Sequence, residues 1–161
     1  MKKLAFLLAL CLSFCLLTAC GGGPQTSMSD AELEKKAETY QLNYSEEDIQ
    51  AAIAVAQQYY ADLATQTIDP NLYYEHEIEE MTQWMGWLAQ GVEVTYDMEQ
   101  AALHIENCSL GEYMETAAPG TIMILQVTVP AADEDSEWSH RVVEMNRETT
   151  DSPWFVRTEG I

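Results

Sequence analysis

The chain has 161 residues, of which 27 are Asp or Glu and only 7 are Lys or Arg, so its formal net charge at pH 7 is −20. This length is enough for one folded domain. Nucleic acid and anionic lipid headgroups repel such a surface, so the composition excludes them as direct partners and favours a basic or cation-bridged one. The simpler alternative is that the acidity serves solubility.

The first twenty residues predict an export signal. Two lysines precede a run of 16 uncharged residues ending at Ala19, which is too short to span a bilayer but typical of a signal peptide. The last three residues of the run and the cysteine after it, Leu17-Thr18-Ala19-Cys20, resemble the lipobox of bacterial lipoproteins. The resemblance implies cleavage before Cys20 and a diacylglycerol on its sulfur, and two acyl chains anchor stably. The alternative is an ordinary secretory signal in which Cys20 is incidental.

Removal of residues 1–19 leaves 5 basic against 27 acidic side chains, a net charge of −22. Beyond the lipidated cysteine only Cys108 remains, so no intramolecular disulfide can form and we interpret Cys108 as a small buried hydrophobe. Residues 20–44 are expected to form the lipidated Cys and a flexible acidic tether. Its segment from Asp30 is a marginal helix, and as a coil the tether spans roughly 27 Å.

Two amphipathic helices are expected at the start of the domain, which we assign to residues 45–161. Ser45 and Asp48 form a capping box before about 20 residues with apolar positions three and four apart. Asp69 and Pro70 predict the start of a second helix that runs to Leu88, with Gly91 suited to its exit.

From Gly91 the apolar period changes to two. Alternation predicts strands at 92–96, around Leu103 and Ile105, at 122–129, at 138–148 and at 154–158, with a turn at Pro119-Gly120. We expect no helix between these strands, so they should pair as antiparallel hairpins. The sequence therefore predicts an α+β fold in which two or three N-terminal helices pack on one face of a curved antiparallel sheet.

The order of these elements and the ending SPWFVRTEG, with its Trp154-Phe155-Val156 pattern and then Gly160, resemble a known group. The domain looks like the cone-shaped, cystatin-like fold of the nuclear transport factor 2-like superfamily, and is similar to small uncharacterised Gram-positive lipoproteins. The resemblance implies a conical pocket between helices and sheet, which in the family's enzymes holds an acidic base and oxyanion-stabilising donors.

Periodicity places four residues as candidate lining of such a pocket: Tyr60, Asp62, Trp84 and Tyr96. The alternative is that Tyr60 and Trp84 fill the core. Trp84 and Trp87, three residues apart, also suggest a stacking platform for sugars, although a core-facing helix shows the same pattern.

Other polar patterns are weaker. His76 and Glu80 share a helical face but lack a third metal ligand, and a solvated acidic face explains them better. The acidic run at 133–137 lacks the central glycine and distal glutamate of a calcium loop. The three histidines are scattered. We therefore assign no catalytic residue, no metal and no cofactor.

The sequence favours a membrane-anchored, extracytoplasmic lipoprotein whose domain binds a small ligand or an envelope protein without catalysis. One alternative is an isomerase- or dehydratase-like enzyme with a carboxylate in the cone pocket. The other is a carbohydrate-binding module that uses exposed Trp side chains. Of all the candidate residues, only Cys20 lies in a sequence pattern specific enough to predict a functional site.

Overall fold

The computed structural model describes residues 28–133, 136 and 138–160. The predicted lipidation site Cys20, the predicted signal peptide and most of the acidic run at 133–137 lie outside the described residues. The described elements are, in order, α2 (Asp30–Thr39), α3 (Glu46–Ala64), α4 (Glu75–Leu88), β1 (Glu93–Thr95), α5 (Met98–Asn107), α6 (Gly111–Thr116), β2 (Ile122–Thr128), β3 (His140–Asn146) and β4 (Phe155–Gly160).

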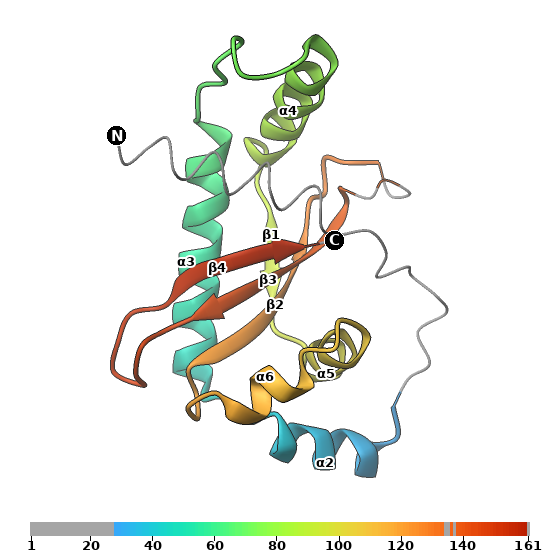
Figure 1. Ribbon diagram of the computed structural model, residues 1–161, viewed down its shortest axis with the longest axis vertical. Helices are drawn as coiled ribbons and strands as arrows, with labels where there is room; N and C mark the ends of the chain where they lie inside the picture. The colour runs from blue at the N-terminus through green and yellow to red at the C-terminus, as the bar shows by residue number, and fades with distance from the viewer. Residues whose placement is uncertain (1–27, 134–135, 137, 161) are drawn as a thin grey trace.

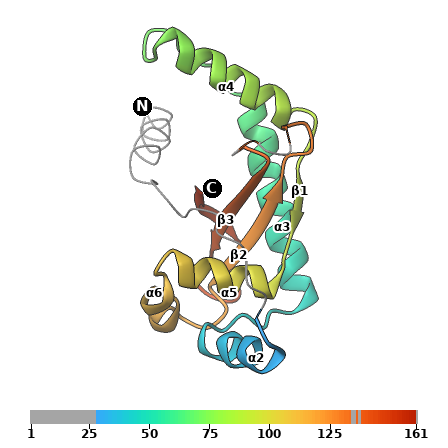
Figure 2. The same cartoon turned by 90° about the vertical axis from the view of Figure 1, so that its right-hand side faces the viewer.

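The strands form one antiparallel sheet in the order β1-β2-β3-β4. The sheet does not close on itself, and helices pack on both of its faces (Figures 1 and 2). This confirms the α+β class expected from the sequence, but the expectation that the helices pack on one face of the sheet is wrong, because α5 and α6 bury apolar side chains of the other face. No helix among the described residues is long and apolar enough to cross a membrane.

The long helix α3 covers the first face of the sheet. Ser45 caps it as expected, since its hydroxyl accepts a hydrogen bond from the Asp48 backbone N–H at 3.2 Å. Its buried stripe packs, together with α4, against side chains that alternate along the strands, because successive residues of a strand face opposite sides. This core consists of Ala52, Ala56, Tyr60, Leu63, Trp84, Leu88, Val94, Met123, Leu125, Val127, Val129, Val143, Met145 and Trp154.

One end of the second face is covered by α5 and α6, with α2 packed outside them (Figure 2). Ala101, Ala102 and Ile105 of α5 are fully buried against this face. The expectation of a strand around Leu103 and Ile105 is therefore wrong, as is that of a strand run without helices. The side chain of Asp97 caps α5 by accepting from the Gln100 N–H at 3.0 Å, and burial of a helical stripe stabilises the helix over a strand.

Residues 28–44, which the sequence places in the tether, are folded. Tyr40 and Leu42 are buried in the core under α2, and Lys36 pairs with Glu106 of α5 at 2.7 Å. The Tyr40 hydroxyl donates to the same carboxylate, which raises the pKa of Tyr40 to about 12. Coil dimensions therefore do not apply to this part of the tether, because tertiary contacts stabilise a helix that is marginal alone.

The second helix of the sequence begins later than expected. Its first residue is Glu75, because Asp69 does not cap a helix but closes a turn. The Asp69 carboxylate accepts hydrogen bonds from the backbone N–H of Asn71 at 3.0 Å and from its side-chain amide at 2.8 Å. Gly91 and Gly120 have positive φ angles of 103° and 69°, as the predicted helix exit and turn require.

Candidate functional site

The four residues expected to line a pocket do not come together. Tyr60 is fully buried in the core between α3 and the sheet, and Trp84 is buried beside the ring of Trp138 at a centroid distance of 5.0 Å. Asp62 lies on the exposed side of α3 and accepts a hydrogen bond from Gln58 at 2.8 Å. Tyr96 is half-buried, and its hydroxyl donates to the Leu42 carbonyl. These contacts are structural.

The burial of Trp84 also argues against the sugar platform. Its side chain is 9% exposed and packs against the guanidinium of Arg141, 5.1 Å from the ring centroid, while Trp87 is half-buried against the same core. A stacking platform needs ring faces open to solvent. In the described part of the chain, the pair Trp84 and Trp87 therefore serves the core.

A row of polar side chains crosses the second face of the sheet next to α6, and we call it the polar row. It consists of Gln126 on β2, Glu144 and Asn146 on β3, Arg157 on β4, and Tyr113 on α6. The register pairs Ile124 with Glu144 and Gln126 with Val142, so Gln126 and Glu144 are diagonal neighbours on one face.

Glu144 is the centre of the polar row. It is 8% exposed, and its carboxylate accepts a hydrogen bond from the Arg157 guanidinium at 3.2 Å. The guanidinium in turn lies 4.2 Å from the ring centroid of Tyr113, a cation–π contact. Burial raises the pKa of the Glu144 carboxyl, and the charge of Arg157 acts in the opposite direction. A register shift between Glu144 and Met145 marks the same point of the sheet.

Two amide groups flank this pair with buried atoms that lack partners. The Gln126 carbonyl accepts from the Asp97 N–H at 2.8 Å, which leaves its buried amide nitrogen without a hydrogen bond among the described residues. The Asn146 amide nitrogen donates to the Tyr113 hydroxyl at 3.2 Å, and its buried oxygen has no partner there either. Either orientation of the Asn146 amide leaves one of its polar atoms unpaired. Buried polar groups are normally satisfied, so each of these atoms needs a partner, which can be an ordered water molecule or a ligand.

The raised pKa of Glu144 predicts a pH dependence. Between the pKa of the carboxyl in the unfolded chain, about 4.3, and its higher value in the folded protein, the folded state binds more protons. The contribution of Glu144 to the free energy of unfolding should therefore fall as pH rises through this window, which gives a negative slope. Glu144→Gln should remove that slope and raise stability above the window, measured by urea unfolding at a series of pH values. An unchanged slope in Glu144→Gln would contradict this assignment.

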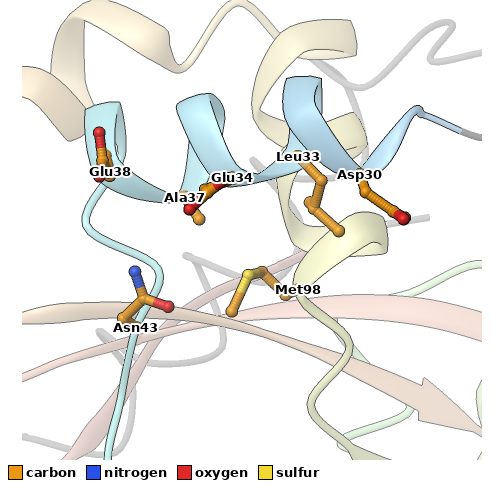
Figure 3. Close-up of a pocket in the computed structure, with 7 residues that line it drawn as sticks. All are labelled: Asp30, Leu33, Glu34, Ala37, Glu38, Asn43 and Met98. Carbon is orange, nitrogen blue, oxygen red and sulfur yellow. The ribbon is translucent and has the colours of Figure 1, made fainter.

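A separate groove lies between α2 and the start of α5 (Figure 3). The apolar side chains of Leu33 and Met98 lie in the space under the helix, while Asp30 and Glu38 stand at its two ends. The remaining lining residues are Glu34, Ala37 and Asn43. The acidic side chains along this groove are exposed and therefore solvated. The groove offers no buried polar group that could orient a ligand.

The described residues contain no metal-binding cluster, because no three His, Cys, Asp or Glu side chains lie close enough to share an ion. His76 stacks on Tyr74 at a centroid distance of 6.0 Å. Half-buried His104 has a pKa lowered by burial, and its Nδ1 lies 3.8 Å from the Cys108 sulfur within one turn of α5.

Comparison with protein-family models, with curated proteins and with solved structures finds no match to this chain. The function must therefore be argued from the site. Sequence patterns missed the polar row, although one signal was present. In the predicted strand at 138–148, Glu144 stands between the apolar residues Val143 and Met145, so a carboxylate falls within the apolar centre of the strand.

Proposed function

We propose that this protein is a membrane-anchored extracytoplasmic lipoprotein whose domain binds a small polar ligand at the polar row. The observation that carries the proposal is the pair of buried, unpartnered amide atoms of Gln126 and Asn146 beside the Glu144–Arg157 ion pair. Leaving a buried donor or acceptor unpaired costs about 1–3 kcal/mol. A ligand that satisfies both atoms recovers that free energy as binding affinity.

The chemistry of the row defines the ligand class. The Gln126 amide nitrogen requires an acceptor, the Asn146 amide requires a complementary polar group, and the half-exposed guanidinium of Arg157 is accessible from solvent. Because the chain is strongly acidic, its field disfavours multiply charged anions. We therefore propose a neutral or zwitterionic molecule with both donors and acceptors, such as an amino acid or a small amide.

The family expected from the sequence remains part of this proposal. Helices packed on an antiparallel sheet support a nuclear transport factor 2-like domain, whose ligand pocket is expected between helices and sheet. The polar row lies between β2–β4 and α6, which agrees with that expectation.

The variant Asn146→Leu tests the ligand site. The change removes an incompletely bonded amide together with its hydrogen bond to the Tyr113 hydroxyl, so stability without ligand should fall by no more than about 1 kcal/mol. Thermal unfolding of the full protein is followed with a panel of amino acids, small amides and sugars. At 100 times Kd a ligand stabilises by about 2.7 kcal/mol, and this shift should disappear in Asn146→Leu.

The matched control is Asn43→Leu, which makes the same chemical change at an exposed residue of the α2 groove. It should keep the ligand-induced shift. The proposal fails if no compound stabilises the wild-type protein, if the shift persists in Asn146→Leu, or if Asn43→Leu abolishes it. The last result would place the ligand in the groove instead.

One observation favours the enzyme alternative. A buried carboxyl with a raised pKa, as at Glu144, is a typical general acid or base. The ion pair with Arg157 argues instead that Glu144 orients the ligand, because its carboxylate is already bonded to the guanidinium. Once a ligand is known, Glu144→Gln should change its affinity; a variant that binds normally but no longer converts the ligand would favour catalysis.

Lipid anchoring has a direct test. Cys20→Ala removes the sulfur to which the diacylglycerol is attached, so the protein should move from the membrane fraction to the soluble fraction of cells that produce it. Immunoblots of both fractions measure the change. The control is Cys108→Ala, which should stay with the membrane. Retention of Cys20→Ala in the membrane would refute the anchor.

A further inference from the structure

The loop between α3 and α4, residues 65–74, exposes two large apolar side chains. Leu72 is 56% exposed and Tyr74 is 74% exposed, although most large apolar side chains of the described chain are buried. Figure 1 shows this loop at the end of the molecule opposite α2. Exposed apolar side chains that lie together mark interaction sites, whereas isolated ones are normal, and Leu72 and Tyr74 are only two residues apart in this loop.

Hydrogen bonds hold this loop in place. Besides the turn closed by Asp69, the Leu72 N–H donates to the Asp69 carbonyl at 3.1 Å. The Tyr74 N–H donates to the Glu77 carboxylate at 2.7 Å, and the Tyr74 ring stacks on His76 with an interplanar angle of 13°. A loop already held in one conformation loses less entropy when it binds a partner.

The charge around the loop has a single sign. No Lys or Arg occurs between residues 37 and 140, so neither α3 nor α4 carries one. Asp69 lies in the loop, and the first two turns of α4 contain Glu75, Glu77, Glu79 and Glu80. Apart from His76, which is titratable, the charged side chains that flank Leu72 and Tyr74 in the loop and the first two turns of α4 are therefore all acidic.

We propose that this loop docks a partner protein that presents an apolar pocket rimmed by Lys or Arg. Tyr and large aliphatic side chains supply the buried centre of such interfaces, and opposite charges at the rim speed association and exclude wrong partners. A second copy would bring acidic groups against acidic groups, and anionic lipid would be repelled in the same way. This inference is independent of the ligand proposed for the polar row.

Photo-crosslinking in the cells that make the protein tests the proposal. A photoreactive amino acid replaces exposed Pro70 in the loop, and in a matched control it replaces exposed Glu34 on α2. The loop position is also combined with Leu72→Ser and Tyr74→Ser, and separately with the conservative pair Leu72→Ile and Tyr74→Phe. Because both side chains are exposed, all variants should fold, which circular dichroism checks. Crosslinked peptides are identified by mass spectrometry.

We expect one protein to crosslink from position 70 and not from position 34, through a peptide rich in Lys or Arg. Its yield should fall at least about tenfold with the two serine changes, as expected for loss of central interface side chains, and should survive the conservative pair. The proposal is overturned by a crosslink to a second copy, to lipid or to a non-basic region. It is equally overturned by equal yields from positions 70 and 34, or by a yield that the serine changes do not alter.

Discussion

Arg147→Ala should lower the free energy of unfolding by about 3 kcal/mol, a large part of the 5–15 kcal/mol typical of a domain. The Arg147 side chain is only 6% exposed and pairs with Asp48 at the start of α3 at 2.7 Å. Its Nε donates to the Gly120 carbonyl at 2.7 Å, and its guanidinium lies 4.2 Å from the Trp154 ring centroid. Alanine removes all three contacts and leaves a cavity between α3 and the sheet.

Guanidinium chloride unfolding measures this change, with the slope of the transition expected to stay constant. The matched control is Arg157→Ala, which deletes the same side chain at a position that is 43% exposed. That variant should cost clearly less than Arg147→Ala, because the Arg157 guanidinium is half exposed, although its loss leaves the buried Glu144 carboxyl without its partner. Equal losses in the two variants would show that Arg147 does not join α3 to the sheet as its contacts indicate.

Trp84→Ala should cost about 3–5 kcal/mol, the range for truncating a buried aromatic side chain. Beyond the cavity, the change removes one of the two rings beside the buried guanidinium of Arg141, which lies 5.1 Å from Trp84 and 5.2 Å from Trp138. The same unfolding experiment measures the loss. This prediction separates the core role of Trp84 from the ligand-binding role that its spacing first suggested.

Trp87→Ala is the control for Trp84→Ala, since it makes the same truncation on the same helix at a half-buried position. Its cost should be less than half as large, because less apolar surface leaves water when Trp87 packs. If Trp84→Ala leaves stability unchanged and abolishes sugar binding, the carbohydrate-binding hypothesis is restored and the packing argument fails.

Helices and turns were predictable from the sequence where the local pattern of capping, turn and apolar residues favours the same conformation as the tertiary packing. The helix α3 has a capping serine, acidic residues in its first turn and a long apolar stripe, and the structure confirms it. The turn before β2 likewise follows from Pro119-Gly120, because Gly120 adopts a positive φ there. In these segments local propensity and tertiary packing favour the same conformation.

The segment from 98 to 116 shows why other elements were missed. Leu103 and Ile105 alternate with polar residues, which is the pattern of a strand, but two apolar residues are too few to distinguish a period of two from a helical one. The buried positions Ala101, Ala102 and Ile105 follow the helical period instead. Alanine is weakly hydrophobic, so this stripe was visible only once its neighbours in α2 and β2 were known.

The polar row could not be predicted from the sequence, because it depends on how distant segments pair. Glu144, Arg157 and Tyr113 come together only through the register of β3 with β4, the irregularity after Glu144 and the packing of α6. The sequence showed a carboxylate at the centre of a strand but not its partner. Conversely, the periodicity that grouped Tyr60 with Trp84 was correct as evidence of a shared core.

The arrangement of the few cations has a consequence for how copies distribute in a membrane. Lys36 and Arg147 are held by carboxylates, Arg141 by two Trp rings, and Arg157 by Glu144 and Tyr113. Most positively charged side chains therefore interact within their own molecule, and the surfaces of neighbouring molecules face each other with acidic side chains. Copies that the proposed anchor confines to one plane repel at separations within about 8 Å, the screening length at physiological salt. On the proposed anchor, we therefore expect copies to stay dispersed laterally until a cationic partner brings them together.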